Sequence, residues 1–149
     1  MQIAKVSLAS IIIALLVGCS STGYVTKSNL NVPRVVKVQS GTHPEVAPYL
    51  PEFIDALRSA GFVIGRTDNP DALEFKLEFN PNPFNIRVSA SLLQHGVPIV
   101  SASATNPGWG TALARGSAVN GRAEAALDSF KEQLAELSKR ITIIPEKSQ

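Results

Sequence analysis

Leu73-Glu-Phe-Lys-Leu-Glu-Phe79 is the clearest strand pattern in the chain. Apolar residues occupy every second position in it, and Glu74, Lys76 and Glu78 occupy the positions between them. Because successive side chains of a strand point to opposite faces of a sheet, one face of this strand is apolar and the other is charged. That pattern is typical of an antiparallel strand with a hydrophobic core on one side and solvent on the other.

Two further strands are expected directly after it, because the alternation resumes twice. Asn80-Pro-Asn-Pro83 breaks the chain, residues 86–92 form the next strand, and His95-Gly96 turns the chain into residues 97–105. Serines occupy the alternate positions of this hairpin and predict that one of its faces is polar: Ser89, Ser91, Ser101 and Ser103.

The flanking segments predict two helices and shorter strands. Residues 34–38 and 62–66 are expected to be parallel strands, joined by a right-handed crossover through a helix that begins near Pro48 and ends before Gly61. A second helix follows, with Asn120 as its N-cap, and residues 141–144 add a short strand. The apolar stripe of this second helix consists of Ala123, Ala126, Leu127, Phe130, Leu134, Leu137 and Ile141.

Together these elements predict an α+β fold. We expect a mostly antiparallel sheet of about four to six strands, with two helices packed on one face. The chain of 149 residues is long enough for one such domain with a hydrophobic core.

The N-terminus has the pattern of a secretory signal. Lys5 supplies a positive charge, and the apolar run from Val6 to Gly18 has no charged residue. That run ends at Cys19, before the polar residues that follow, so it is shorter than the roughly 20 apolar residues of a membrane-spanning helix. We therefore expect residues 1–18 to be a signal peptide.

The residues at the end of this run, Leu16-Val17-Gly18-Cys19, resemble the lipobox of bacterial lipoproteins. The resemblance implies that Leu16, Val17 and Gly18 are recognised by the signal peptidase. It also implies that Cys19 carries a diacylglycerol and an N-acyl chain, and no other cofactor is expected. Ser20 stands where lipoproteins kept in the inner membrane typically carry Asp, so the periplasmic face of the outer membrane is favoured. The alternative is an ordinary secretory signal that is cut elsewhere.

The expected domain organisation follows from this anchor. Residues 19–32 are expected to be the lipidated cysteine and a flexible tether, residues 33–144 the single α+β domain, and residues 145–149 a C-terminal tail. The alternative is that Tyr24 and Val25 begin a short strand that docks on the domain. Since Cys19 is the only cysteine, the chain contains no intramolecular disulfide.

Charge and residue pattern argue against several classes of function. The formal net charge is only +2 and the basic residues are scattered, which argues against nucleic acid as a partner. His43 and His95 lie far apart in expected loops, so no metal site is predicted. Glu74 and Glu78 share a strand face with Lys76 and are interpreted as a solvated surface rather than as a catalytic pair. No catalytic residue is assigned.

One loop stands out as a possible interaction site. Trp109, the only tryptophan, lies between two glycines in the segment 106–117, and Arg115 follows it. Trp109 either covers the core from outside or is an exposed anchor for a partner, because a large rigid ring is buried at small entropic cost. In the second case Arg115 joins the interface.

These observations lead to a functional hypothesis. We expect a membrane-anchored envelope lipoprotein that acts in the periplasm as a non-catalytic binding or assembly module, through a sheet edge or the Trp109 loop. Its partners would be the membrane and one or more envelope proteins. The alternatives are a periplasmic enzyme, a carrier of a small ligand or lipid with a pocket between helices and sheet, and a purely structural role in a larger complex.

Overall fold

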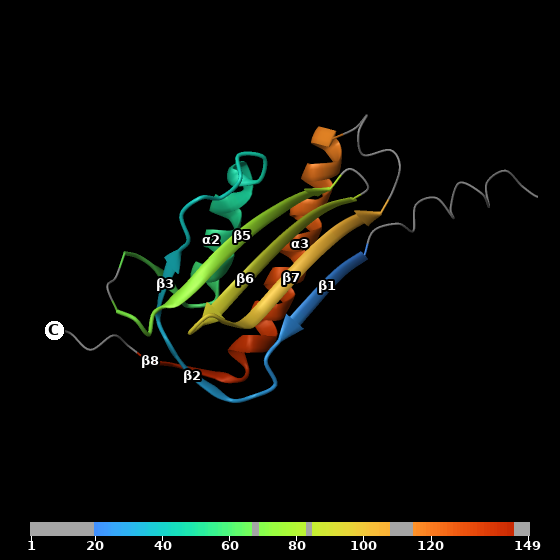
Figure 1. Ribbon diagram of the computed structural model, residues 1–149. Coiled ribbons are helices and arrows are strands. Elements are labelled where there is room, and N and C mark those ends of the chain that lie inside the picture. Colours follow the sequence, from blue (N-terminus) through green and yellow to red (C-terminus); the bar gives the residue numbers. More distant parts are fainter. Residues whose placement is uncertain (1–19, 67–68, 83–84, 108–114, 145–149) are drawn as a thin grey trace, which may run out of the picture.

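The computed structural model describes residues 20–66, 69–82, 85–107 and 115–144. Figure 1 shows the order of the elements along the chain. They are β1 (Ser20–Val25), β2 (Leu30–Pro33), β3 (Val35–Val38), the 3-10 helix η1 (Ala47–Tyr49), α2 (Leu50–Ser59), β4 (Val63–Ile64), β5 (Leu73–Asn82), β6 (Asn85–Gln94), β7 (Val97–Pro107), α3 (Arg115–Ser138) and β8 (Ile141–Ile144).

A six-stranded sheet forms the centre of the domain, with the strand order β1-β7-β6-β5-β3-β4. β5, β6 and β7 make the expected antiparallel meander, while β3 lies parallel to both β4 and β5. β2 and β8 pair in parallel as a separate two-stranded sheet. The prediction of an α+β fold with a mostly antiparallel sheet is therefore confirmed.

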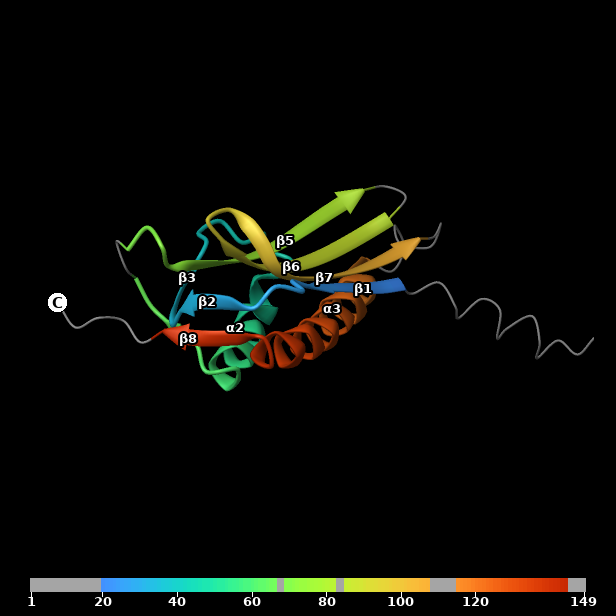
Figure 2. The same cartoon turned by 90° about the horizontal axis from the view of Figure 1, so that it is seen from below.

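Both helices cover the same face of the sheet, as the view from below shows (Figure 2). Three phenylalanines meet between the layers: Phe53 from α2, Phe75 from β5 and Phe130 from α3, with ring centroids 5.5 to 6.0 Å apart. All three are fully buried. The apolar positions of the alternating strands therefore face this core, and their polar positions form the uncovered face of the sheet.

Small residues let α3 approach the sheet closely. Ala90, Ala102 and Ala104 are buried on the covered face of β6 and β7, and Gly23 of β1 lies beside Ala102 in the register. A Cβ atom at Gly23 would lie only 2.5 Å from the Nε2 atom of Gln133 in α3. The residues along this row are small because the helix passes directly over them.

The tether expected over residues 19–32 is corrected by the structure from Ser20 onward. Ser20–Val25 forms β1 and pairs with β7 over its whole length, and Leu30–Pro33 forms β2. The alternative, in which Tyr24 and Val25 belong to a docked strand, holds. Although this segment has little apolar content, Val25 packs against the core and Val32 is fully buried in it, which supplies the contacts that order both strands.

Two smaller expectations are also wrong. β5 continues through Pro81, where a break was expected, because β3 pairs only with the beginning of β5 and leaves that side of the strand without a ladder for the proline to interrupt. α3 begins at Arg115, so Asn120 lies inside the helix and is not its N-cap. Asn120 instead accepts a hydrogen bond from the Tyr49 hydroxyl.

The turn between β6 and β7 was predicted correctly. His95 and Gly96 have positive φ angles of 51° and 76°, as two-residue hairpin turns of type I′ require. In the described part of the chain, no helix is both long and apolar enough to cross a membrane.

Candidate functional site

Several of the site residues predicted from the sequence lie outside the described residues. These are Cys19 with its recognition residues Leu16, Val17 and Gly18, and Trp109. Arg115 is the first residue of α3. The most distinctive part of the described surface is β1, the strand that begins directly after Cys19.

β1 is an edge strand with one free side. Among the described strands only β7 pairs with it. The backbone N–H of Thr26 donates to the carbonyl of Ile99 in β7, at 2.9 Å. Successive residues of a strand direct their backbone groups to opposite sides, so every second residue points the same way. The backbone N–H and C=O groups of Tyr24 and Thr22, two and four residues before Thr26, therefore also point to β7. The backbone N–H and C=O groups of Ser21, Gly23 and Val25 point away from it and form what we call the free edge of β1.

This edge lacks the features that usually protect an exposed strand. Edge strands are commonly very short, charged, interrupted by proline or bulged, since unpaired backbone groups are a template for another strand. β4, at the other edge of the sheet, is only two residues long. β1 has six residues without a charge or a proline, and its register with β7 is regular throughout.

Side chains on both sides of the strand border the free edge. On the uncovered face, Tyr24 is 51% exposed. On the covered face, the side chain of Gln133 reaches under Gly23. A strand added here would therefore meet an aromatic ring on one side and a primary amide on the other.

Hydroxyl groups dominate the uncovered face next to this edge. The hydroxyl oxygens of Thr22 and Ser103 lie 3.0 Å apart, in hydrogen-bond contact, and Arg87 donates to the Ser103 hydroxyl at 3.2 Å. In the register, Ser89 lies beside Ser103, and Ser91 lies beside Ser101. The expected polar face of the hairpin is confirmed, although Ser103 is only 8% exposed because its neighbours enclose it.

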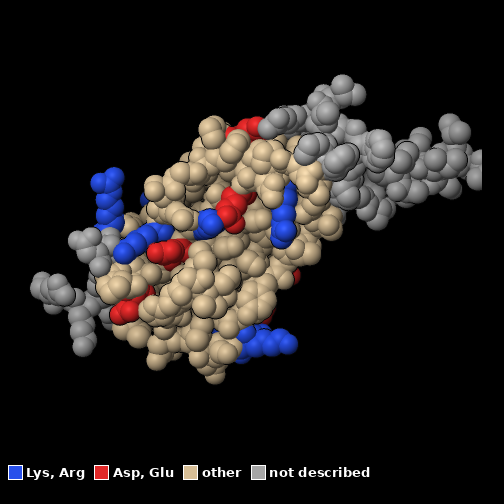
Figure 3. All heavy atoms as spheres, viewed as in Figure 1, with Lys and Arg blue, Asp and Glu red and all other residues tan. Residues whose placement is uncertain are grey.

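The charged side chains of this face lie away from β1 and β7. Figure 3 shows acidic and basic side chains in a band along the middle of the face. Lys76 and Glu78 of β5 form an ion pair of 2.6 Å, and both side chains are at least 40% exposed. β1 and β7 contain no charged residue. The half of the face beside the free edge is therefore polar but uncharged.

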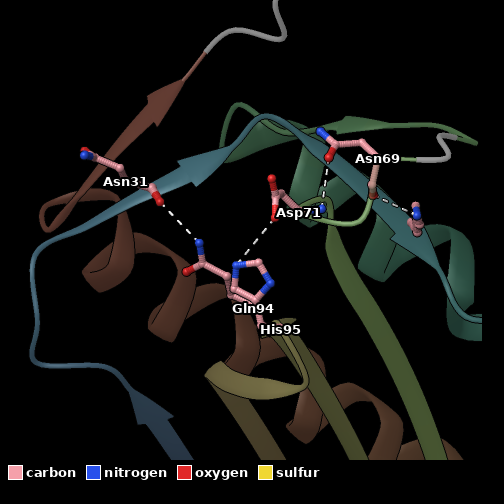
Figure 4. Close-up of polar contacts among 6 residues, drawn as sticks. Asn31, Asn69, Asp71, Gln94 and His95 are labelled. Atoms are coloured by element: carbon pink, nitrogen blue, oxygen red, sulfur yellow. Dashed lines mark hydrogen bonds and ion pairs between the residues drawn. The ribbon is translucent and has the colours of Figure 1, made fainter.

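A second polar cluster surrounds the turn between β6 and β7 (Figure 4). Gln94 donates to the carbonyl of Asn31 at 3.3 Å, and His95 Nε2 lies 3.9 Å from Asp71 Oδ1. The side-chain oxygen of Asn69 accepts a hydrogen bond from the backbone N–H of Asp71. The backbone carbonyl of Asn69 accepts one from the Lys37 ammonium group. These contacts fix the β6–β7 turn against β2 and the loop before β5, which is a structural role.

The two histidines are not brought together. The ring of His43 packs against Phe79, with centroids 4.8 Å apart, and His95 lies in the β6–β7 turn. Within the ranges that the structure describes, no group of three His, Cys, Asp or Glu residues could hold a metal ion.

An open groove runs between the outward sides of α2 and α3. Ala56 and Leu134 lie along it, and Glu52, Asp55 and Lys131 border it. Asp55 pairs with Arg58 on its own helix at 3.0 Å. Nearby on α3, a hydrogen bond from Lys139 and its positive charge lower the pKa of the exposed Glu136 carboxyl. The groove thus has a solvated charged border.

The residues of the free edge were missed because their sequence signal is weak. Ser20-Ser-Thr-Gly-Tyr-Val25 has only two strand-favouring apolar side chains and a central glycine, which resembles a linker. The pair Tyr24-Val25 was the part of this segment that indicated a strand. Gln133 gave none, since its position under Gly23 depends on the path of α3 across the sheet.

Comparisons with known proteins do not assign a family. No family model matches the chain, and no curated protein matches it. Among solved structures, the chain is similar to the PelC dodecamer from Paraburkholderia phytofirmans, with 14% sequence identity, a TM-score of 0.43, and coverage of 80% of this chain and 97% of that chain. It is also similar to a minor lipoprotein from Acinetobacter baumannii, with 12% identity, a TM-score of 0.42, and coverage of 74% and 94%.

Proposed function

We propose that the chain is a membrane-anchored envelope lipoprotein whose domain is a non-catalytic binding or assembly module, and that it binds an envelope protein by adding a strand of that partner to the free edge of β1. One observation carries the proposal. β1 begins at Ser20, directly after the cysteine of the lipobox-like sequence, and leaves Ser21, Gly23 and Val25 unpaired on its outer side within the described chain.

Strand addition fits the chemistry of this edge. A partner strand would gain backbone hydrogen bonds from Ser21, Gly23 and Val25, and side-chain pockets would add specificity. Tyr24 supplies exposed ring surface for such a contact, and the absence of charge in β1 removes the usual penalty for strand pairing. Anchoring by Cys19 would hold this edge at the membrane, where an envelope partner could meet it.

The carrier alternative is less favoured by the packing between helices and sheet. The space that a ligand pocket would need is occupied by large buried side chains, including Phe53, Phe75 and Phe130. The enzyme alternative would need convergent titratable groups in a cleft. Glu78, which could have been one, forms an ion pair with Lys76 on the open face.

Proline substitution separates partner binding from folding. In Ser21→Pro the lost N–H points away from β7, so the β1–β7 ladder is kept, whereas Thr22→Pro removes an N–H that faces β7. We expect Ser21→Pro to keep its melting temperature and to lose the envelope proteins that co-purify with the wild-type protein after crosslinking. Thr22→Pro should lower the melting temperature. Unchanged co-purification of the Ser21→Pro variant would contradict strand addition.

The anchor is tested separately from the edge. Cys19→Ser should abolish metabolic labelling with palmitate and release the domain from the membrane fraction. Density separation of the two membranes should place the wild-type protein in the outer membrane. Persistent labelling of the Cys19→Ser variant would contradict the lipid anchor and leave the edge to be judged by the proline pair.

A further inference from the structure

One end of the sheet lies directly beside the proposed anchor. Ser20 of β1 pairs with Thr105 of β7, Thr105 pairs with Arg87 of β6, and Arg87 pairs with Asn80 of β5. We call these four residues, which form the last row shared by all four strands before β5, β6 and β7 continue by two residues, the end row. Since β1 starts one residue after Cys19, no linker separates the end row from the lipidated residue.

Covalent geometry places Arg87 close to the lipid. Consecutive Cα atoms are about 3.8 Å apart, so Cys19 lies within about 4 Å of Ser20. Neighbouring strands are about 4.8 Å apart, which puts the Arg87 backbone about 10 Å from Ser20 along the end row. The guanidinium of Arg87 contacts Ser103, two residues inward from Thr105, so this long exposed side chain turns toward Ser20 to reach the headgroup layer once the acyl chains of Cys19 are in the membrane.

The charge at this end suits an anionic surface. Arg87 donates to the neutral Ser103 hydroxyl, and among the described residues it forms no ion pair. Arg122 of α3 lies at the same end, where its Nη1 atom is 3.5 Å from the carbonyl oxygen of Thr105. No acidic residue occurs in the sequence ranges 79–94 and 101–123. Glu45 comes toward this end from another segment, because its N–H contacts His43, which packs on Phe79. Glu78, one row further in, is paired with Lys76.

We infer that the end row faces the headgroup layer of the membrane that holds Cys19, and that the guanidinium of Arg87 binds lipid phosphate there. The inference rests on the proposed lipid anchor. Guanidinium groups suit phosphate because their planar N–H groups match two of its oxygens. Strands β1, β7, β6 and β5 then rise from the membrane, and the turn at His95 lies at the far end of the domain.

Fluorescence quenching can measure this orientation on the intact lipidated protein. Asn80→Cys places a thiol in the end row, and Val97→Cys places one at the opposite end of the sheet, where Val97 is 64% exposed. Cys19 does not react with a thiol-specific bimane label in the lipidated protein, because its sulfur carries the diacylglyceryl group. The labelled proteins are inserted into vesicles of phosphatidylethanolamine and phosphatidylglycerol that contain a lipid with a nitroxide on its headgroup.

We expect strong quenching at position 80 and several-fold weaker quenching at position 97. Adding Arg87→Gln to the Asn80→Cys protein should reduce its quenching. Arg34→Gln is the matched control, because Arg34 is an exposed arginine before β3 at the far end, and it should have no effect.

Each other outcome contradicts a defined part of the account. Equal quenching at positions 80 and 97 would overturn the orientation, and equal effects of Arg87→Gln and Arg34→Gln would overturn the phosphate contact. Vesicle flotation is measured on the same samples. A protein that does not float with the vesicles would show that the anchor itself is wrong, and the inference would fall with it.

Discussion

The hydroxyl oxygens of Thr22 in β1 and Ser103 in β7 lie 3.0 Å apart on the uncovered face of the sheet. Their contact joins the first strand of the domain to the meander, and Arg87 extends it to β6. A segment with the composition of a linker is thereby held as the edge strand of a six-stranded sheet.

Thr22→Val should destabilise the domain, because it removes the hydroxyl that contacts Ser103 while keeping a β-branched side chain. A single hydrogen bond of this kind contributes about 0.5–1.5 kcal/mol to the free energy of unfolding. Urea unfolding measures the change. Ser91→Ala, on the same face but without a hydrogen-bond partner among the described side chains, should change stability by less; an equal loss in both variants would argue against the Thr22–Ser103 contact.

Gly23 and Gln133 should show energetic coupling. Alanine is favoured over glycine in a strand by about 0.5–1 kcal/mol, but a Cβ at position 23 requires the Gln133 side chain to move. We expect Gly23→Ala to be close to neutral alone and stabilising in a Gln133→Ala background. A double-mutant cycle of unfolding free energies measures this difference, and additive effects would mean that α3 does not pass under β1 as described.

Gly96→Ala and Gly121→Ala should have opposite effects on stability. A Cβ would contact nothing within 4 Å at either position, so only the backbone decides. Gly96 has a φ of 76°, where alanine costs about 1–2 kcal/mol. Gly121 lies inside α3, where replacing glycine by alanine raises the free energy of unfolding by about 1 kcal/mol. Thermal unfolding of both variants tests the turn and the helix together; a stabilised Gly96→Ala would contradict the turn.

Phe130→Ala should be strongly destabilising, because Phe130 contacts both Phe53 and Phe75 at the centre of the core. Removing a buried phenylalanine ring costs about 3–5 kcal/mol when the cavity does not collapse. Chemical unfolding measures this cost. A loss below about 1 kcal/mol would mean that the space between helices and sheet is loosely filled, and the carrier alternative would regain support.

The meander and both helices could be predicted from local sequence patterns. The alternation of Leu73-Glu-Phe-Lys-Leu-Glu-Phe79 specified which face of β5 is buried, and the positive-φ turn at His95-Gly96 fixed the next strand pair. These features depend on residues that are close in sequence. Each pattern carries its own physical cause, which is the period of the strand or the backbone of the turn.

The part of the site formed by β1 could not be predicted in this way. Ser20–Val25 is ordered by β7, about 80 residues later in the chain, through pairs such as Thr22 with Ser103. Nothing in its own composition reports that pairing, so it resembled a tether. The free edge, the position of Gln133 under Gly23 and the end row all follow from that one long-range contact.

Amide hydrogen exchange along Ser20–Val25, followed residue by residue by NMR, determines whether this segment is an edge strand with a free side. If β1 is a strand with one free side, the N–H groups of Thr22 and Tyr24 should exchange slowly and those of Ser21 and Gly23 quickly. In the complex with a partner strand, Ser21 and Gly23 should become protected as well. Uniformly fast exchange over the whole segment would show that it is a tether and that β1 does not pair with β7.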